Sequence, residues 1–221
     1  MKKLLLATAA VLGLAAPGIA HATLTYTVWN GAGLPLSLSP IPPAVPAVPT
    51  TGLIANFTST QDNLPFTTVG EANTFGNFFT ATAAVGSGPY PITSGALPLA
   101  GTIMSTADNS ITSFIRITET YNDQAGPILG GLTHDDAAEI FVDGVFVCGT
   151  SGPTPPVNNA CALPAGAGSH SLQLFYTETN GGPAVLQVNL PTEAVPEPAS
   201  LALLGSALIG FGVWRRRRRT S

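Results

Sequence analysis

The chain has 221 residues, a formal net charge of −4 and only 9% charged residues. Basic residues gather at the ends (Lys2 and Lys3, then Arg215–Arg219), and Arg116 is the one arginine or lysine between residues 23 and 194. This central part is acidic, which argues against binding to phosphate backbones, and its lack of lysine excludes any mechanism that needs one.

The first 22 residues are predicted to form a secretory signal peptide. Lys2 and Lys3 precede an apolar run from Leu4 to Leu14, and the small residues Ala20 and Ala22 form a small-x-small cleavage site. The apolar run is too short for a spanning helix. We therefore expect a signal helix that is removed after Ala22, with an uncleaved signal anchor as the alternative.

Residues 23–194 are predicted to form one exported, all-β domain. They are rich in Thr, Val, Ile and Phe and dense in Gly and Pro, without a long helical period. Residues 34–50 are proline-rich and should form an extended loop without strand pairing. Strands are expected at residues 23–29, 52–58, 77–83, 101–106, 111–121, 139–148, 170–177 and 184–190.

Three of these segments carry the clearest patterns. Between Ile111 and Tyr121, the apolar Ile115 and Ile117 alternate with polar residues, as in a strand with one buried face. Residues 170–177 alternate in the same way, with Leu174 and Tyr176 on one face. Asp143-Gly144 separates two apolar runs and predicts a tight hairpin, because both turn positions favour positive φ. Short antiparallel strands at this spacing predict a β-sandwich of jelly-roll-like form.

The two cysteines, Cys148 and Cys161, both lie in the exported part. In an oxidising compartment such a pair is most simply a disulfide. No histidine lies at zinc-finger spacing from them, so they do not indicate a zinc site.

The end of the chain has three features in order. Val195-Pro196-Glu197-Pro198 is followed by an uncharged apolar run, 199–214, and then by Arg215, Arg216, Arg217, Arg218 and Arg219. As a helix the run would span about 24 Å, slightly less than the ~30 Å hydrocarbon core, with the arginines on the cytoplasmic side. This order resembles the PEP-CTERM sorting signal, whereas an ordinary C-terminal membrane anchor is the alternative.

The PEP-CTERM resemblance implies a temporary anchor in the inner membrane. In that family a membrane protease of the exosortase type recognises the tail, and the folded part is released or passed to the cell surface. Residues 195–221 would then be a sorting segment with a transmembrane helix, and the protein would end at the cell surface or outside the cell.

The richest polar stretch runs from Thr133 to Val147 and begins with two carboxylates, Asp135 and Asp136, before an apolar strand. Such carboxylates must be solvated, hydrogen-bonded or bound to a cation. Together with the later stretch from Ala165 to Leu186, it resembles the protective-antigen-type β-sandwich of flocculin-type adhesins and many glycosidases. The later stretch contributes Gly166, Gly168, His170, Tyr176, Glu178 and the turn Gly181-Gly182 to this resemblance.

In the adhesin members of that family, the aspartate pair is joined by a cis peptide and binds calcium beside a sugar. Carried over, the calcium ligands would be Asp135, Asp136 and Asn180. Here Ala137 stands where a glycine usually follows the second aspartate, and the later loop is short. The alternative is that the aspartates solvate or cap a turn.

The remaining candidates are less specific. His134 lies beside Asp135 but lacks any nucleophile context, and Glu139 and Glu178 could form a pair of glycosidase carboxylates. Arg116 is expected to pair with an acid within the sandwich, and His170 to be a packed strand residue.

From the sequence as a whole we expect a non-enzymatic, polysaccharide-binding surface or biofilm-matrix protein. The alternatives are a purely structural matrix protein without a small ligand and a glycan hydrolase.

Overall fold

The computed structural model of the chain describes residues 23–39, 43–68, 73–80, 91–98, 100–122 and 126–191. The predicted signal peptide and the predicted sorting tail lie outside these residues. No helix among the described residues is long and apolar enough to cross a membrane.

Apart from one short helix, the regular secondary structure of the described chain is antiparallel strands in three sheets. The large sheet has the order β4-β2-β1-β5-β12-β8-β9, the small sheet β10-β7-β13-β3, and β11 pairs with β6. The elements of the large sheet are β1 (Leu24–Gly31), β2 (Leu53–Ser59), β4 (Ser94–Gly95), β5 (Thr112–Asn122), β8 (Ala137–Val142), β9 (Val145–Thr150) and β12 (Ser169–Glu178). The others are β3 (Asn63–Thr67), α1 (Phe75–Thr80), β6 (Gly126–Pro127), β7 (Leu132–Asp135), β10 (Val157–Asn159), β11 (Ala162–Leu163) and β13 (Val185–Asn189).

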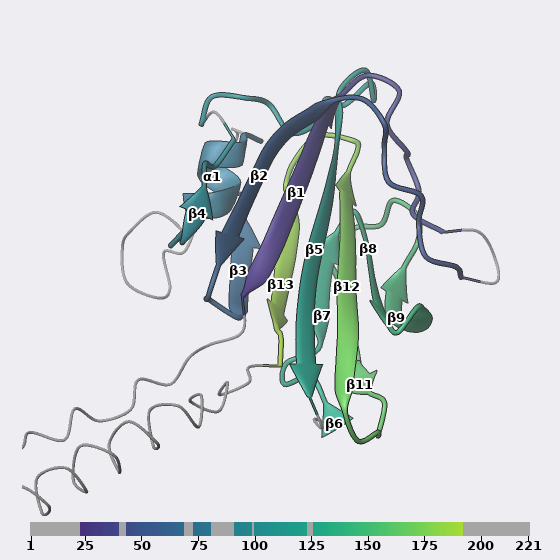
Figure 1. Cartoon of the computed structure of the whole chain (residues 1–221). Helices are drawn as coiled ribbons and strands as arrows, with labels where there is room; N and C mark the ends of the chain where they lie inside the picture. The colour runs from purple at the N-terminus through teal and green to yellow at the C-terminus, as the bar shows by residue number, and fades with distance from the viewer. Residues whose placement is uncertain are drawn as a thin grey trace, which may run out of the picture. The chain divides into compact units, whose positions relative to one another are not determined.

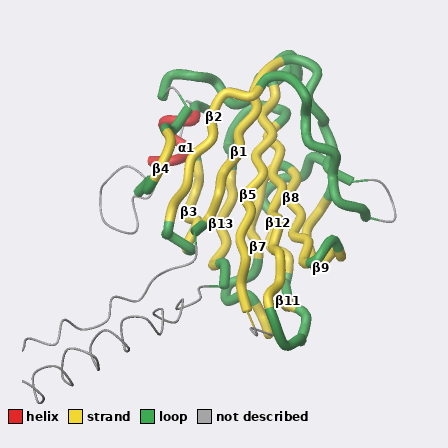
Figure 2. Tube along the Cα trace, in the orientation of Figure 1, coloured by secondary structure: helices red, strands yellow, loops and turns green. Residues whose placement is uncertain are grey.

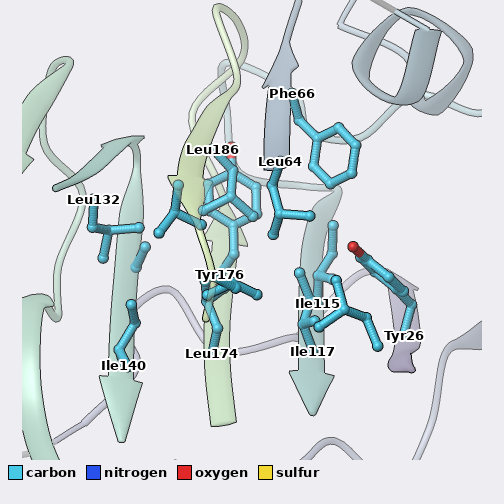
Figure 3. Close-up of a cluster of buried hydrophobic side chains, with 14 of the residues drawn as sticks. Tyr26, Leu64, Phe66, Ile115, Ile117, Leu132, Ile140, Leu174, Tyr176 and Leu186 are labelled. Atoms are coloured by element: carbon cyan, nitrogen blue, oxygen red, sulfur yellow. The ribbon is translucent and has the colours of Figure 1, made fainter. Parts of the chain in front are cut away.

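The main core lies between the large and the small sheet. Figure 1 shows β3, β13 and β7 behind β1, β5 and β12, and Figure 2 shows the strands as the dominant element. Alternation sends one set of side chains from each sheet into this core. It includes Tyr26, Leu64, Phe66, Ile115, Ile117, Leu132, Ile140, Leu174, Tyr176 and Leu186 (Figure 3).

The predicted alternation along two strands is confirmed. Ile115 and Ile117 of β5 face the main core, and Leu174 and Tyr176 of the adjacent β12 face it too. The predicted hairpin joins β8 to β9, and Asp143 and Gly144 at its turn have φ values of 51° and 79°. These positive φ values are those that a two-residue hairpin turn requires.

A second apolar cluster covers the outer face of the large sheet. It unites Leu34 and Leu38 of the proline-rich segment with Trp29, Phe114, Ala137, Phe141 and Phe175 of the sheet. The segment is fixed where Leu38 N donates to Ser151 O at 2.7 Å. As predicted, its described part contains no strand. Because it covers the sheet, every residue of β8 is buried and the usual alternation of burial disappears there.

Two predicted strands differ in the structure. Residues 75–80, which include part of the strand expected at 77–83, form α1 instead. Phe75, Phe78 and Phe79 are spaced i, i+3, i+4 and all three are buried, so one helical face meets the core. The strand expected at 101–106 is reduced to a single bridge between Thr74 and Ile103.

Candidate metal centre

The two aspartates lie where the chain crosses from the small sheet to the large one. Asp135 is the last residue of β7, Asp136 stands alone, and β8 begins at Ala137. The peptide bond between Asp135 and Asp136 is cis, as the resemblance to the protective-antigen-type sandwich implied. The crossing places both carboxylates beside the end of β12, where Glu178 is the last residue.

Asp136 is completely buried, and its two carboxylate oxygens have different surroundings. Oδ2 accepts hydrogen bonds from Thr179 N at 2.9 Å, Thr179 Oγ1 at 2.8 Å and Asn180 N at 3.3 Å. Oδ1 has no hydrogen-bond partner among the described residues, although it too is buried. A buried carboxylate oxygen without a hydrogen-bond donor is costly, so Oδ1 is suited to be the ligand atom of a cation.

Glu178 completes a cluster of three acids. One carboxylate oxygen from each of Asp135, Asp136 and Glu178 lies within 4.8 Å of the others, and all three residues are buried. Glu178 was part of the resemblance but was not predicted to be a ligand. The signal was present in the sequence, because Glu178 continues the inward-facing series of Leu174 and Tyr176 and therefore points an acid into the sandwich.

The hydrogen bonds around Glu178 define where its proton lies in the absence of a cation. Ser105 Oγ donates to Glu178 Oε1 at 2.9 Å while it accepts from Asn73 Nδ2 and Gly181 N. Tyr176 OH lies 2.6 Å from Asp135 O and 2.9 Å from Glu178 Oε2. Since a carbonyl can only accept, the single Tyr176 proton goes to Asp135 O, and the second bond needs a proton on Glu178.

The pKa values agree with this proton arrangement. Burial, followed by the charge of Asp136, raises the pKa of Glu178 from 4.5 to about 9. Burial and the neighbouring Asp136 carboxylate raise the pKa of Asp135 from 3.8 to about 7. The pKa of Tyr176 is raised well above 10, first by burial and then by the charge of Glu178. Three ionised carboxylates therefore cannot share this space without a compensating positive charge.

A divalent cation would supply that charge. Carboxylate oxygens are the ligands that calcium prefers, and calcium tolerates irregular coordination. Arg116, the one arginine or lysine between residues 23 and 194, lies elsewhere: its guanidinium stands over the ring of Trp29, 5.9 Å from the centroid. The donor set, its burial and the unpartnered Oδ1 of Asp136 thus fit a cation such as calcium.

The structure brings some other predicted residues to the centre, but not in the predicted way. Asn180 contacts Asp136 through its backbone N–H and is exposed, so a side-chain ligand role for Asn180 stays a prediction. His134 is buried, and its Nδ1 donates to the backbone oxygen of Asp136 at 2.6 Å rather than to a carboxylate. His134 therefore positions the aspartate pair through the main chain and forms no His-Asp catalytic pair there.

Glu139 and Glu178 do not form a carboxylate pair. Glu139 is directly opposite Phe175, which belongs to the outer apolar cluster, whereas Glu178 shares the inward face of β12 with Tyr176. The two glutamates therefore point to opposite faces of the large sheet. Glu139 instead accepts a hydrogen bond from Ser39 Oγ at 2.5 Å, and burial raises its pKa.

Three further predictions concern residues away from the centre. Cys148 and Cys161 form the predicted disulfide, with 5.4 Å between their Cα atoms. The prediction that Arg116 pairs with an acid is wrong for the described residues, where Arg116 has no ion pair. It lies on the outer face of the sheet, where the aromatic ring of Trp29 takes the place of an acid. His170 is a packed strand residue whose ring lies against that of Tyr121 at a tilt of 32°, and its Nδ1 donates to Asp143 Oδ2 at 2.7 Å.

Comparison with known proteins gives matches to solved structures and to one protein-family model. Among solved structures, the chain is similar to the "PA14 sugar-binding domain from RTX adhesin", with a TM-score of 0.48 and 17% identity over 76% of this chain and 88% of that one. It is also similar to the PA14 domain of the MpAFP antifreeze protein, with a TM-score of 0.49 and 14% identity over 79% of this chain and 82% of that one. A third match, the GH31 alpha-xylosidase from Xanthomonas citri, has a TM-score of 0.41 and 12% identity over 80% of this chain and only 16% of the enzyme.

No curated protein matches the chain. The sequence of residues 194–218, however, matches the family model of the PEP-CTERM protein-sorting motif. This range contains Val195-Pro196-Glu197-Pro198, the apolar run and most of the arginine cluster. The order of these three features was the basis of the sequence prediction, and the match confirms it: the chain carries a PEP-CTERM protein-sorting motif at its C-terminal end.

Proposed function

We propose that this is an exported, exosortase-processed protein whose β domain binds polysaccharide through a calcium ion at Asp135, Asp136 and Glu178. The sorting motif supports export and a transient anchor in the inner membrane before the domain reaches the cell surface or the extracellular matrix. The single observation that carries the calcium site is the buried acid cluster with its unpartnered Asp136 oxygen.

The protein's own residues would hold and orient the cation. Thr179 and the backbone of Asn180 fix Oδ2 of Asp136, which leaves the buried Oδ1 without a donor among the described residues and available to a cation. Ser105 fixes one oxygen of Glu178. Because calcium takes six to eight oxygen ligands, a bound ion would accept sugar hydroxyls at the coordination positions that the protein leaves open.

This role requires no catalytic group, and we propose a binding protein rather than an enzyme. A hydrolase would need two carboxylates on either side of one bond, whereas Glu139 and Glu178 lie on opposite faces of a sheet. A purely structural matrix protein is the remaining alternative, and it differs from the proposal in having no glycan ligand.

The calcium site is tested by thermal unfolding of the exported protein in millimolar calcium and in chelator. At a hundred times its Kd, calcium should stabilise the fold by about 2.7 kcal/mol, which corresponds to a rise in Tm of roughly 5–10 °C. Asp136→Asn should abolish the rise, and Asp62→Asn, an acid between β2 and β3, should keep it. Equal Tm values with and without calcium would refute the site.

A glycan array with and without calcium then tests the polysaccharide part. Calcium-dependent binding that is lost in Asp136→Asn supports the proposal. A calcium-dependent rise in Tm without any glycan binding would leave a structural calcium site and favour the matrix protein.

A further inference from the structure

A polar groove lies on the outer face of the small sheet, separate from the acid cluster. Its volume is about 280 Å³, and its lining includes Asn63, Pro65, Leu129, Thr133, Gln187 and Asn189. In the sheet register, Gln187 is opposite both Pro65 and Thr133, and Asn189 is opposite Asn63. Since Leu64 and Leu186 face the core, these neighbours present their side chains outward as a polar surface across three strands.

One wall of the groove is held in place before any ligand arrives. The turn at residues 129–131 has positive φ at Gly130 and Gly131, 80° and 70°. Asn158 Nδ2 donates to Gly130 O at 2.8 Å, and Asn189 Nδ2 donates to Leu129 O at 3.1 Å. A preformed groove avoids the entropic cost of ordering a loop on binding.

The chemistry of the lining determines which ligands fit. None of the lining residues is ionisable, and half-buried Asn63 and exposed Gln187 contribute side-chain amides. Each amide offers both donors and an acceptor, which is what a sugar hydroxyl requires. Leu129, with 75% of its surface exposed, and Pro65 supply apolar surface for the C–H faces of a sugar ring.

We propose that this groove binds an uncharged polysaccharide chain and does so without a cation. The acidic exported domain repels anionic polymers, and its one arginine, Arg116, lies on the outer face of the other sheet, where it contacts Trp29. The inference rests on the proposed function only in that the domain meets polysaccharide. It adds a second binding surface, which begins at Thr133, two residues before Asp135 on β7.

Affinity electrophoresis of the exported protein in native gels tests this groove. The gels contain soluble dextran, mannan or galactan, with polygalacturonate as the anionic comparison, and all runs contain chelator. We expect retardation by at least one neutral polysaccharide and none by polygalacturonate. The double variant Gln187→Ala/Asn63→Ala should bind about tenfold more weakly, because it loses two amides that sugar hydroxyls would contact.

One control variant and one change of condition test whether binding belongs to this groove. Asn56→Ala removes an exposed amide from β2 of the large sheet and should bind as the unaltered protein does. The proposal that this groove binds polysaccharide is overturned if none of the three neutral polysaccharides retards the protein. It is also overturned if the double variant is retarded as much as the unaltered protein. Retardation that appears only when calcium replaces the chelator, and that persists in the double variant, also overturns the proposal, while it supports the calcium site.

Discussion

Removal of the ionisable group of Glu178 provides the sharpest test of the acid cluster. In the absence of a cation, the pKa of Glu178 is raised to about 9 in the folded protein, mainly by burial, from an ordinary value of 4.5. The folded state therefore keeps a proton that the unfolded chain has lost. Stability from this group is fully present below about pH 4.5 and is lost as the pH rises through about 9.

The magnitude follows from this window. Between the two pKa values, each rise of one pH unit lowers the free energy of unfolding by about 1.36 kcal/mol. Glu178 should therefore lower it by about 2.7 kcal/mol between pH 5 and pH 7. Asp135, whose pKa is raised to about 7, adds a loss of the same sign over this range. The comparison must therefore isolate the contribution of Glu178.

Glu178→Gln provides this comparison because the amide mimics the protonated acid. Its oxygen can accept from Ser105 Oγ and its NH₂ can donate to Tyr176 OH, as protonated Glu178 does. Urea unfolding of both proteins in chelator at pH 5, 6 and 7 measures the difference. From pH 5 to pH 7, the free energy of unfolding of the variant should rise by about 2.7 kcal/mol relative to that of the unaltered protein.

Parallel stability profiles of the two proteins over this range would show that Glu178 is not held protonated, and the reasoning about the cluster would fail.

A second comparison of the two proteins uses calcium. Because a cation favours ionised carboxylates, saturating calcium at pH 7 should stabilise the unaltered protein more than it stabilises Glu178→Gln. Equal calcium stabilisation of both proteins would remove Glu178 from the ligand set.

Three further predictions concern the rest of the chain. The double variant Cys148→Ser/Cys161→Ser should lose about 3 kcal/mol in urea unfolding, because the disulfide closes a short loop of sequence separation 13; an unchanged midpoint contradicts this. Asn30 Nδ2 contacts Ile103 O, Met104 O, Thr112 O and Ser113 Oγ. Asn30→Ala should therefore cost about 1–3 kcal/mol, whereas exposed Asn56→Ala should change stability by less than about 0.5 kcal/mol. Mass spectrometry of the exported protein should show Thr23 at its start and no Arg215–Arg219, and intact protein that retains the arginines would contradict processing of the sorting motif.

The sequence predicted those parts of the fold that depend on local patterns. Alternation along 111–121 and 170–177 identified the inward faces of β5 and β12, because a strand sends successive side chains to opposite sides. Asp143-Gly144 identified the hairpin because its turn needs two positive φ values. Near Phe75–Thr80 the local signal was ambiguous, since a short apolar run fits a strand or a helix equally well.

The sequence by itself also identified the sorting motif, the disulfide partners and the aspartate pair, because each is a contiguous motif or, for the cysteines, the one possible pair. Only the tertiary structure brought Glu178 to Asp136 and Ser105 to Glu178, since these residues come from segments far apart in the chain. The tertiary structure also placed Glu139 and Glu178 on opposite faces of the large sheet, because the register between β12 and β8 sets Glu139 opposite Phe175. Pairing between strands far apart in the sequence decides which side chains meet, and the pattern along one strand gives its two faces but not its partner.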